Sequence, residues 1–462
     1  MAGVEGAGFG SRLTGMNLAI IGAGWAGLAA SVAATKAGCH VTVFEASRTF
    51  GGRARAVPAT MPDGTAVLLD NGQHILIGAY RETLKVMTQV GVNPLLVLHS
   101  QPLALKFPDG NGVEFPNWPS PVNALAGIFG VRAWRMADKF SLLLAALKWQ
   151  WNRFNCPDHL TVAQLCRGIT PKIMVDLIEP LCVSALNTPA QQASAQVFLR
   201  VMKDSLFGAA GGSDLLLPKQ DLSTLFPNAA AEWLTKNGGR VRLGTRVEKL
   251  FPDSARPGWR VDGQRFDAVI VAGSAPHAVQ LLSTPHEATP DNITNQIADW
   301  TRVAASLQFE AITTVYACST NAALPHPMLA LHSGVPGKDP AQFVFDRGQL
   351  GGPCGLLAFV VSASNADRQQ IEAQVLAQAK SQLGMNMVAV QTIVEKRATF
   401  ACTPGLVRPA TRIAPGLYAC GDYCDGPYPA TLEGAVKSGL AAVEALKQER
   451  QTHEKPSLAP AG

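Results

Sequence analysis

The 462-residue sequence predicts an α/β protein, in which a Rossmann-like dinucleotide-binding domain carries an inserted domain of mixed α+β structure. Two observations at opposite ends of the chain predict this class. Residues 17–45 have the pattern of a strand, a glycine-rich turn, a helix and a second strand, and residues 416–447 have that of a strand, a turn and a long helix. A third short strand is predicted at 267–272. Strands this far apart share one sheet only if the chain between them folds beside it.

The first element is a glycine-rich turn between two buried strands. A short apolar run at 18–21 precedes it, and a helix at 26–37 and a strand at 41–44 follow. The turn fits the G-x-G-x-x-G pattern, whose glycines permit a tight turn, the approach of a pyrophosphate and close packing of helix on strand. The free N–H groups of the helix N-terminus then face the phosphates. The residues predicted to contact the cofactor here are Gly22, Gly24, Trp25, Ala26 and Gly27.

The residues after the second strand distinguish NAD from FAD. Glu45 ends that strand about 20 residues after the glycines, where a carboxylate can accept hydrogen bonds from a ribose, and Ala46 follows it. A second glycine pair then precedes Arg53, with Gly52 beside the arginine. A nicotinamide-binding domain needs no such pair, whereas an arginine there can bind phosphate or approach a flavin. The pattern E-A-S-x-x-x-G-G-R resembles the FAD-binding fingerprint of the superfamily of amine oxidases, phytoene desaturases and protoporphyrinogen oxidases.

The C-terminal segment agrees with this superfamily. A strand at 416–420 is followed by a Gly-Asp turn and by a helix that continues to about residue 447. The resemblance implies an amine-oxidase-type FAD domain, with the aspartate near the ribityl chain and the helix N-terminus at the flavin, where its dipole favours negative charge. It also implies that Val247 lends its backbone to the adenine. The C-terminal residues predicted to bind FAD are Gly421, Asp422, Thr431, Leu432 and Glu433.

Composition limits the remaining possibilities. The chain is 47% hydrophobic and has a net charge of only +5, and no Lys/Arg run or nucleic-acid motif occurs, so we expect no nucleic-acid partner. Its nine cysteines include no C-x-x-C pair, which favours reduced thiols, no bound metal and a cytoplasmic location. No cysteine lies at 429–439, so we expect non-covalent FAD. No apolar run is long enough for a membrane-spanning helix.

These motifs give the expected domain boundaries. The FAD-binding domain is assembled from residues 16–76, 230–285 and 405–447. The substrate-binding domain comprises residues 77–229 and 286–404, and includes strands at 341–345 and 356–362. Residues 1–15, which are rich in glycine, and 448–462, which are polar, are predicted to be disordered.

Residues 118–154 carry an unusual combination of side chains. Four of the eight tryptophans are here, at 118, 134, 149 and 151, and five basic residues accompany a single acidic one. An apolar helical stripe is formed by Phe140, Leu144, Leu147 and Trp151. Two interpretations stay open: a helix that lies in the headgroup plane on the inner face of the cell membrane, or a helix packed on the core of its own domain.

Three further segments resemble one subgroup of the superfamily, the bacterial squalene-associated flavin desaturases (hydroxysqualene dehydroxylases). They are L-D-N-G-Q-H-I-L-I-G-A-Y at 69–80, L-L-L-P-x-x-D-L-S at 215–223, and G-D-Y with P-A-T-L-E-G-A at 421–435. The turn at 424–427 departs from the Thr-Asp-Thr-Gly-like pattern of the family. The resemblance implies that the 70–74 segment crosses the flavin ring, which adds Gly72 and Gln73 to the cofactor site.

The subgroup implies a reaction in which hydroxysqualene, an apolar isoprenoid, loses its hydroxyl and receives a hydride from reduced FAD to give squalene. Hydroxide is a poor leaving group and needs protonation as it departs. The first candidate for the acid is His74, because a histidine can be protonated near neutral pH. Two lesser candidates, for which a role as surface or capping carboxylates is favoured, are Asp221 and Asp425.

Three alternatives remain at this stage. A carotenoid-type desaturase would use the same fold to remove hydride from a polyene precursor such as phytoene. An amine oxidase would need an aromatic cage, for which the chain offers only five tyrosines. A non-catalytic lipid carrier with a flavin-type fold would lose flavin contacts that this sequence retains. The electron donor is not identified, because no second motif for a nicotinamide dinucleotide is visible.

Overall fold

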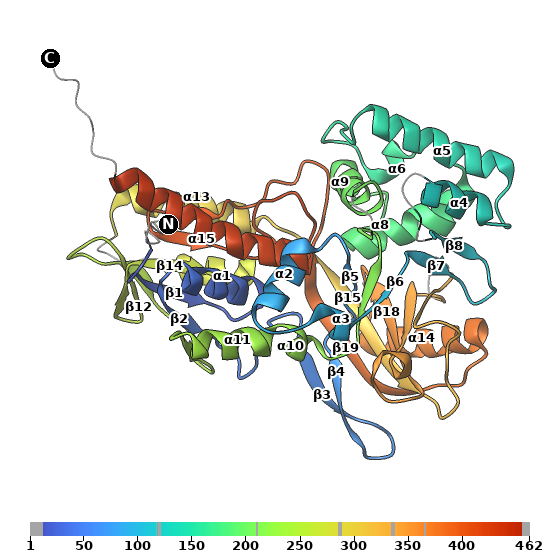
Figure 1. Ribbon diagram of the computed structural model, residues 1–462, viewed down its shortest axis with the longest axis horizontal. Coiled ribbons are helices and arrows are strands. Elements are labelled where there is room, and N and C mark those ends of the chain that lie inside the picture. Colours follow the sequence, from blue (N-terminus) through green and yellow to red (C-terminus); the bar gives the residue numbers. More distant parts are fainter. Residues whose placement is uncertain are drawn as a thin grey trace, which may run out of the picture.

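The computed structural model describes residues 13–454 except 117, 119–121, 209–210, 285–288, 334–337 and 365. Two domains lie side by side (Figure 1). The first is built around a six-stranded sheet of order β10-β2-β1-β14-β21-β20, in which only β20 is antiparallel to its neighbour. Its strands are β1 (Asn17–Ile21), β2 (His40–Phe44), β10 (Arg240–Arg242), β14 (Ala268–Val271), β20 (Arg412–Ala414) and β21 (Leu417–Ala419).

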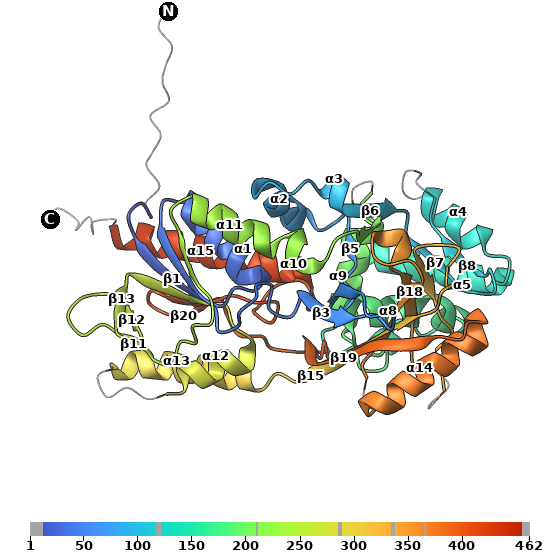
Figure 2. The same cartoon turned by 90° about the horizontal axis from the view of Figure 1, so that it is seen from below.

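Helices cover both faces of this sheet (Figure 2). On one face lie α1 (Trp25–Lys36), α11 (Pro227–Lys236) and α15 (Leu432–Glu454), and on the other lie α12 (Ala275–Leu282) and α13 (Asp291–Ala305). A small antiparallel sheet of β11 (Leu250–Pro252), β12 (Trp259–Val261) and β13 (Gln264–Phe266) flanks them. The predicted α/β class is confirmed: strands from three distant segments form one doubly wound sheet.

The second domain has an antiparallel sheet of order β16-β17-β18-β15-β19, which contains both strands expected for it. Its strands are β15 (Phe309–Cys318), β16 (Met328–Ala330), β17 (Phe343–Asp346), β18 (Leu356–Ser362) and β19 (Val388–Phe400). Helix α14 (Arg368–Leu383) packs on one face through Ile371 and Val375. Because side chains alternate along a strand, Phe343 and Phe345 of β17 point to the opposite face.

Helices stack above this sheet (Figure 1). They are α4 (Val122–Gly130), α5 (Met136–Trp151), α6 (Val162–Leu165), α7 (Pro171–Ile173), a π-helical turn at Met174–Ile178, α8 (Glu179–Leu186) and α9 (Ala195–Leu206). Shorter elements join the two domains: β3 (Ala56–Thr60), β4 (Ala66–Asp70), β5 (Leu76–Ile77), α2 (Arg81–Gln89), α3 (Pro94–Val97), β6 (Leu98–Gln101), β7 (Ala104–Lys106), β8 (Gly112–Glu114), β9 (Leu215–Pro218), α10 (Leu222–Leu225) and a 3-10 turn at Gly348–Leu350.

Two helices assigned by the sequence to the substrate domain instead share the core of the dinucleotide domain. Val86 and Met87 of α2, and Leu222 and Leu225 of α10, are buried in the same apolar cluster as Leu28 of α1. Helix α2 packs against α15, and α10 packs against α11. The domain boundaries otherwise stay a prediction.

The ends of the chain are more ordered than the sequence suggested. Helix α15 continues to Glu454, past the tail expected from residue 448, because Glu449 accepts hydrogen bonds from Arg412 Nε and Tyr418 Oη, both at 2.8 Å. Leu13 is fully buried, although residues 1–15 were expected to be disordered. The rest of both expected disordered segments, 1–12 and 455–462, lies outside the described residues.

None of the helices in the described part of the chain is both long and apolar enough to cross a bilayer. All nine cysteines are free thiols, six of them buried and one, Cys354, exposed.

The contact between α1 and α15 generates a prediction. A Cβ atom on Gly439 would lie 2.3 Å from the carbonyl oxygen of Ala26, so Gly439→Ala forces the two helices apart. We expect a loss of about 1–3 kcal/mol in the free energy of unfolding, measured by urea titration. Ala441→Ser changes an exposed position of the same helix and should cost less than about 1 kcal/mol. Equal stability of the two variants would contradict this packing.

Candidate cofactor and active site

The first glycine turn brings backbone against backbone. Gly22 has φ +118°, and a Cβ atom on it would lie 2.7 Å from the carbonyl oxygen of Ala272 at the end of β14. A Cβ atom on Gly27 would lie 2.0 Å from the carbonyl oxygen of Gly22. The turn therefore tolerates no side chain at either position, which agrees with the tight turn and close helix packing predicted for them. Gly27 itself is behind the cavity wall.

The second glycine pair stacks on the first turn. Gly51 N donates to Ala23 O at 2.9 Å, and a Cβ atom on Gly52 would lie 3.3 Å from Gly24 Cα. Two backbone segments thus approach each other with no side chain between them. A path free of side chains, at the N-terminus of α1, is the cradle that a pyrophosphate needs, so the residues present fit the predicted dinucleotide.

Glu45 stands at the end of β2, where the sequence placed it. Its Oε2 accepts a hydrogen bond from Ala23 N at 2.7 Å, and its Oε1 accepts one from Ser47 N at 2.8 Å. These bonds fix the carboxylate beside the first glycine turn, and the residue lines the cavity together with Ala46 and Val247.

Trp25 and Ala26 begin α1 and also line the cavity. The Trp25 indole makes its contacts with other residues of the chain. Its Nε1 donates to Ala54 O at 3.0 Å, and its ring packs at 5.0 Å from the ring of Phe226. The side chain thereby fixes the chain that follows the second glycine pair.

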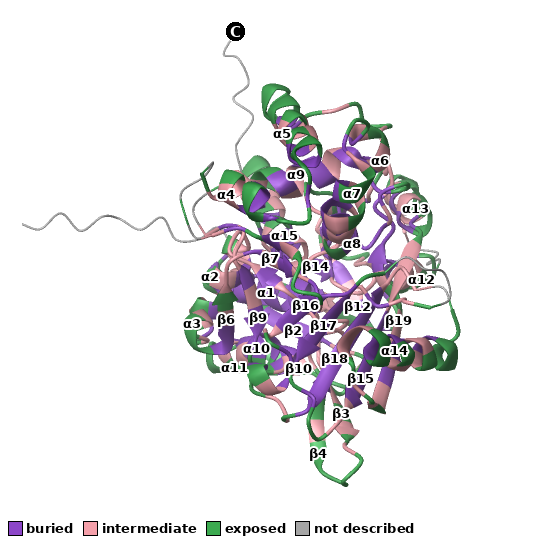
Figure 3. Ribbon diagram, turned by 90° about the vertical axis from the view of Figure 1, so that its right-hand side faces the viewer, coloured by how far each residue is buried: buried purple, intermediate pink, exposed green. Residues whose placement is uncertain are grey.

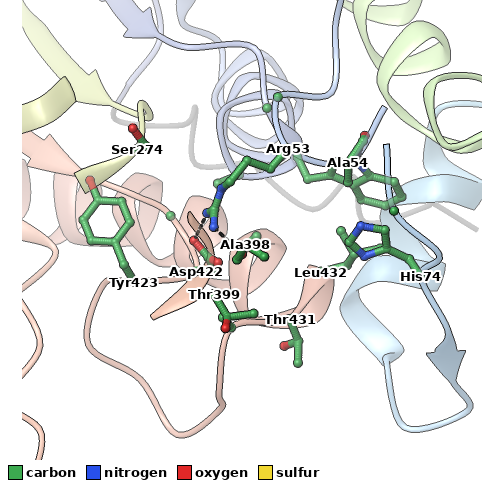
Figure 4. Close-up of a pocket in the computed structure, with 18 of the residues that line it drawn as sticks. Arg53, Ala54, His74, Ser274, Ala398, Thr399, Asp422, Tyr423, Thr431 and Leu432 are labelled. Carbon is green, nitrogen blue, oxygen red and sulfur yellow. Dashed lines mark hydrogen bonds and ion pairs between the residues drawn. The ribbon is translucent and has the colours of Figure 1, made fainter. Parts of the chain in front are cut away.

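Arg53 is the centre of the site (Figure 4). Its guanidinium forms an ion pair with Asp422 and donates to Ala398 O at 2.7 Å. Burial disfavours the charged guanidinium, but the Asp422 carboxylate outweighs it and raises the pKa of Arg53 above its ordinary value. Both predicted residues line the cavity and are in direct contact, although 369 positions separate them in the chain.

The segment at 70–74 is held from both sides. Asn71 accepts a hydrogen bond from Arg55 N at 3.0 Å, and Gln73 Nε2 donates to Tyr316 Oη at 2.7 Å. Arg347 Nη1 donates to Gln73 Oε1 at 3.3 Å. Gly72, Gln73 and His74 all line the cavity.

His74 projects beside Leu432 at the start of α15 (Figure 4). Burial and the nearby Arg53 cation lower the pKa of His74 to about 4. The expectation that this histidine is protonated near neutral pH is therefore wrong: its imidazole is neutral at pH 7.

The two other candidate acids do not line the cavity. Asp221 is the N-cap of α10, where its Oδ1 accepts from Thr224 N at 3.0 Å. Asp425 is exposed in the loop before α15. Both have the surface or capping role that the sequence analysis kept as the alternative.

Glu433 also turns away from the cavity. It is 2% exposed, and its Oε2 accepts from Thr83 N at 2.9 Å and from Thr83 Oγ1 at 2.7 Å, so the carboxylate caps the N-terminus of α2. The walls near it are formed by Thr431, Leu432 and Gly421. Sequence spacing could not reveal this, because Thr83 and Glu433 are 350 positions apart.

One cavity of about 1090 Å³ joins these groups to the second domain. It exceeds the range of roughly 300–1,000 Å³ that is usual for a single small ligand. Beyond His74 its walls are mainly apolar and come from the antiparallel sheet of the second domain, from α8, from α9 and from segments around β5 and β9: Ile75, Ile77, Leu103, Leu181, Val183, Val201, Met202, Leu206, Leu215, Ile312, Phe343, Phe345 and Val360. The cavity is therefore larger than one small ligand requires.

The sequence analysis missed several polar residues of the cavity. Asp204 Oδ2 accepts from Arg200 Nε at 2.7 Å and from Tyr428 Oη at 2.8 Å, which joins α9 to the loop before α15. Tyr423 is 2% exposed, and its hydroxyl has no hydrogen-bond partner among the described residues. The G-D-Y sequence could have pointed to Tyr423, whereas nothing local marks Asp204.

Comparison with known proteins agrees with this geometry. The model of the family described as flavin containing amine oxidoreductase matches residues 25–447. The chain is 26% identical to hydroxysqualene dehydroxylase of Rhodopseudomonas palustris over 92% of its length and 97% of that protein. It is 24% identical to a 15-cis-phytoene desaturase of an Oncidium hybrid cultivar, over 94% of this chain and 78% of that protein.

Solved structures share the fold. An oxidoreductase of Methanosarcina mazei has a TM-score of 0.71 and 17% identity, and the alignment covers 93% of this chain and 100% of that chain. Reduced UDP-galactopyranose mutase has a TM-score of 0.66 and 15% identity, and the alignment covers 96% of this chain and 97% of that chain.

Proposed function

This chain belongs to the flavin containing amine oxidoreductase family, and we propose that it is an FAD-dependent enzyme that converts hydroxysqualene to squalene. The observation that carries the proposal is the single cavity that joins a dinucleotide cradle to an apolar compartment. The similarity to hydroxysqualene dehydroxylase along 92% of the chain supports this substrate.

We propose that FAD is held without a covalent bond. The stacked glycine turns and Glu45 would hold the pyrophosphate and ribose, Val247 the adenine, and Arg53 with Asp422 the central part of the cofactor. No cysteine is among the described residues that line the cavity, so a thioether to the flavin lacks its sulfur donor. Once bound and reduced, FAD would supply a hydride to carbon.

The reaction replaces a C–OH group by C–H. The C–O bond breaks with its electron pair on oxygen, a proton converts the departing hydroxide to water, and the carbon receives the hydride. An external two-electron donor, a reduced nicotinamide or a reduced redox protein, restores the electrons. The apolar walls exclude water from the carbon centre while its bond to oxygen breaks.

The nine free thiols support a cytoplasmic location for this enzyme.

His74 is the residue to which we assign the proton. It is the histidine on the segment fixed by Asn71 and Gln73, and it projects into the cavity where the dinucleotide half meets the apolar half. Burial and, to a smaller extent, Arg53 make the imidazolium of His74 scarce at pH 7, but the same lowered pKa makes that imidazolium a stronger acid than an ordinary protonated histidine. His74 would transfer its ring N–H proton to the departing hydroxyl.

The decisive experiment supplies the reduced holoenzyme with hydroxysqualene and measures squalene by gas chromatography. We expect one squalene and one reduced flavin oxidised per turnover. The purified chain should be yellow and should release its flavin on acid precipitation. Parallel incubation of the oxidised protein with phytoene separates the desaturase alternative: a desaturated polyene, with no squalene from hydroxysqualene, would overturn the proposal.

The role of His74 is tested by its pH dependence. The protonated fraction of a group with a pKa of about 4 grows about tenfold for each unit by which pH falls towards that value, so turnover should rise between pH 8 and pH 5. His74→Ala should keep its flavin absorbance, lose at least about a hundredfold in kcat and lose this pH dependence. The control His40→Ala alters an exposed histidine on β2 and should leave the flavin absorbance, kcat and the pH dependence unchanged. Wild-type turnover by His74→Ala eliminates the assignment.

A further inference from the structure

Helix α5 is apolar on both of its sides. Its inner side is buried through Leu142 and Trp149, and the Trp149 ring lies edge-on at 6.3 Å from Phe198 of α9. Met136 and the stripe Phe140, Leu144, Leu147 and Trp151 are instead exposed, as are three residues of α4, Val122, Leu125 and Phe129. These eight side chains, 41–89% exposed, are called the outer apolar face below. Figure 3 shows exposed stretches on both α4 and α5. A helix with one side in the core normally shows polar residues on the other.

The exposed charged side chains within residues 122–154, which carry the outer apolar face, are all positive. Asp138 is buried and accepts a hydrogen bond from Arg135 N at the start of α5, and Lys139 is buried and donates to Phe129 O at 2.8 Å. The exposed cations are Arg132, Arg135, Lys148 and Arg153. Within the described ranges none of these four forms an ion pair, so they are available to an anionic surface.

We propose that the outer apolar face docks on an anionic lipid bilayer. Apolar side chains insert among the acyl chains while flanking cations contact lipid phosphates, which is the arrangement of an interfacial helix. The substrate argument, which rests on the proposed function, points the same way. Helix α9 lies between α5 and the cavity, since Phe198 contacts Trp149 while Val201 and Met202 line the apolar compartment. The docked end of the molecule is therefore the end that takes a hydrocarbon dissolved in the bilayer.

The test is co-sedimentation of the holoprotein with vesicles of phosphatidylcholine containing about one third phosphatidylglycerol. We expect binding that weakens at high salt and is far lower on pure phosphatidylcholine. The triple variant Phe140→Ser, Leu144→Ser, Trp151→Ser should lose at least about tenfold in partition coefficient. The control Leu95→Ser, Leu96→Ser removes equally exposed leucines from α3 and should bind as the wild type does. Trp149 is left intact because it belongs to the core.

Two results would overturn the proposal: no vesicle binding by the wild type, or equal loss in the triple variant and the control. A concentration-dependent dimer that the triple variant abolishes, without vesicle binding, would show instead that a second copy covers the face. Turnover of hydroxysqualene in detergent micelles should survive in the triple variant. Absence of that turnover in the wild type refutes the proposed function and leaves the vesicle result standing.

An independent observation concerns Tyr423, whose buried hydroxyl lacks a partner among the described residues. Gly421 makes room for it: a Cβ atom there would lie 2.5 Å from Tyr423 Cε1. The ring lines the cavity near Ser274, across Asp422 from Arg53 (Figure 4). A buried hydroxyl without a partner is costly, and bound FAD has acceptor oxygens. We infer that Tyr423 Oη donates a hydrogen bond to FAD; this rests on the proposed cofactor.

Fluorescence titration of the flavin-free protein tests this. Tyr423→Phe keeps the ring and should raise the Kd for FAD about three- to tenfold. The control Tyr418→Phe removes a hydroxyl bonded to Glu449, outside the cavity, and should leave the Kd unchanged. An unchanged Kd in Tyr423→Phe overturns the inference, whereas wild-type protein that binds no FAD refutes the cofactor proposal itself.

Discussion

The structure depends on one half-buried cation, Arg53. Arg53 joins three segments that are remote in sequence: its own backbone ends the second glycine pair, its Nη1 donates to Ala398 O on β19, and its Nη2 is paired with Asp422 after β21. The first and last segments belong to the dinucleotide domain and the middle one to the substrate sheet. Because a guanidinium has a fixed planar fork of donors, it constrains the relative position of all three. The domain junction is therefore also the place where cofactor and substrate must meet.

The same cation sets the electrostatics of the cavity. The guanidinium of Arg53, although it is paired with Asp422, disfavours a second positive charge nearby. Burial and this guanidinium together lower the pKa of His74. Burial also acts on Asp70 at the start of the 70–74 segment: it raises the pKa of Asp70 to about 6, although the Leu222 N–H and Arg347 favour its charged form. Burial thus favours the neutral form of both groups, but Asp70 is still mostly ionised at pH 7. The mainly apolar walls beyond His74 fit the hydrocarbon substrate proposed for this cavity.

The sequence predicted the parts of the site that depend on backbone shape. Gly22, Gly24, Gly52 and Glu45 could be placed because short-range patterns determine a turn, a helix N-terminus and a strand end. Sequence analysis failed for residues whose role depends on a contact with a segment far away in the chain. Glu433 is a first-turn helix acid in either case, but only the position of α2 decides that it binds Thr83. The capping role of Asp221 was one of the two roles that the sequence analysis considered, because aspartate is a preferred N-cap residue.

The helix at 136–151 shows how far helical geometry alone extends. Successive residues are turned by about 100°, so Trp149 and Trp151 point in nearly opposite directions and cannot share one face. The stripe through Phe140, Leu144, Leu147 and Trp151 therefore does not include Trp149. What the sequence could not decide is which side faces the core, because both are apolar. The contact with Phe198 shows that Trp149 faces the core, and a row of large apolar side chains is exposed on the opposite side of the helix. Exposure of that row in water is unfavourable, so its persistence in a stable domain indicates a surface that is covered when the protein works.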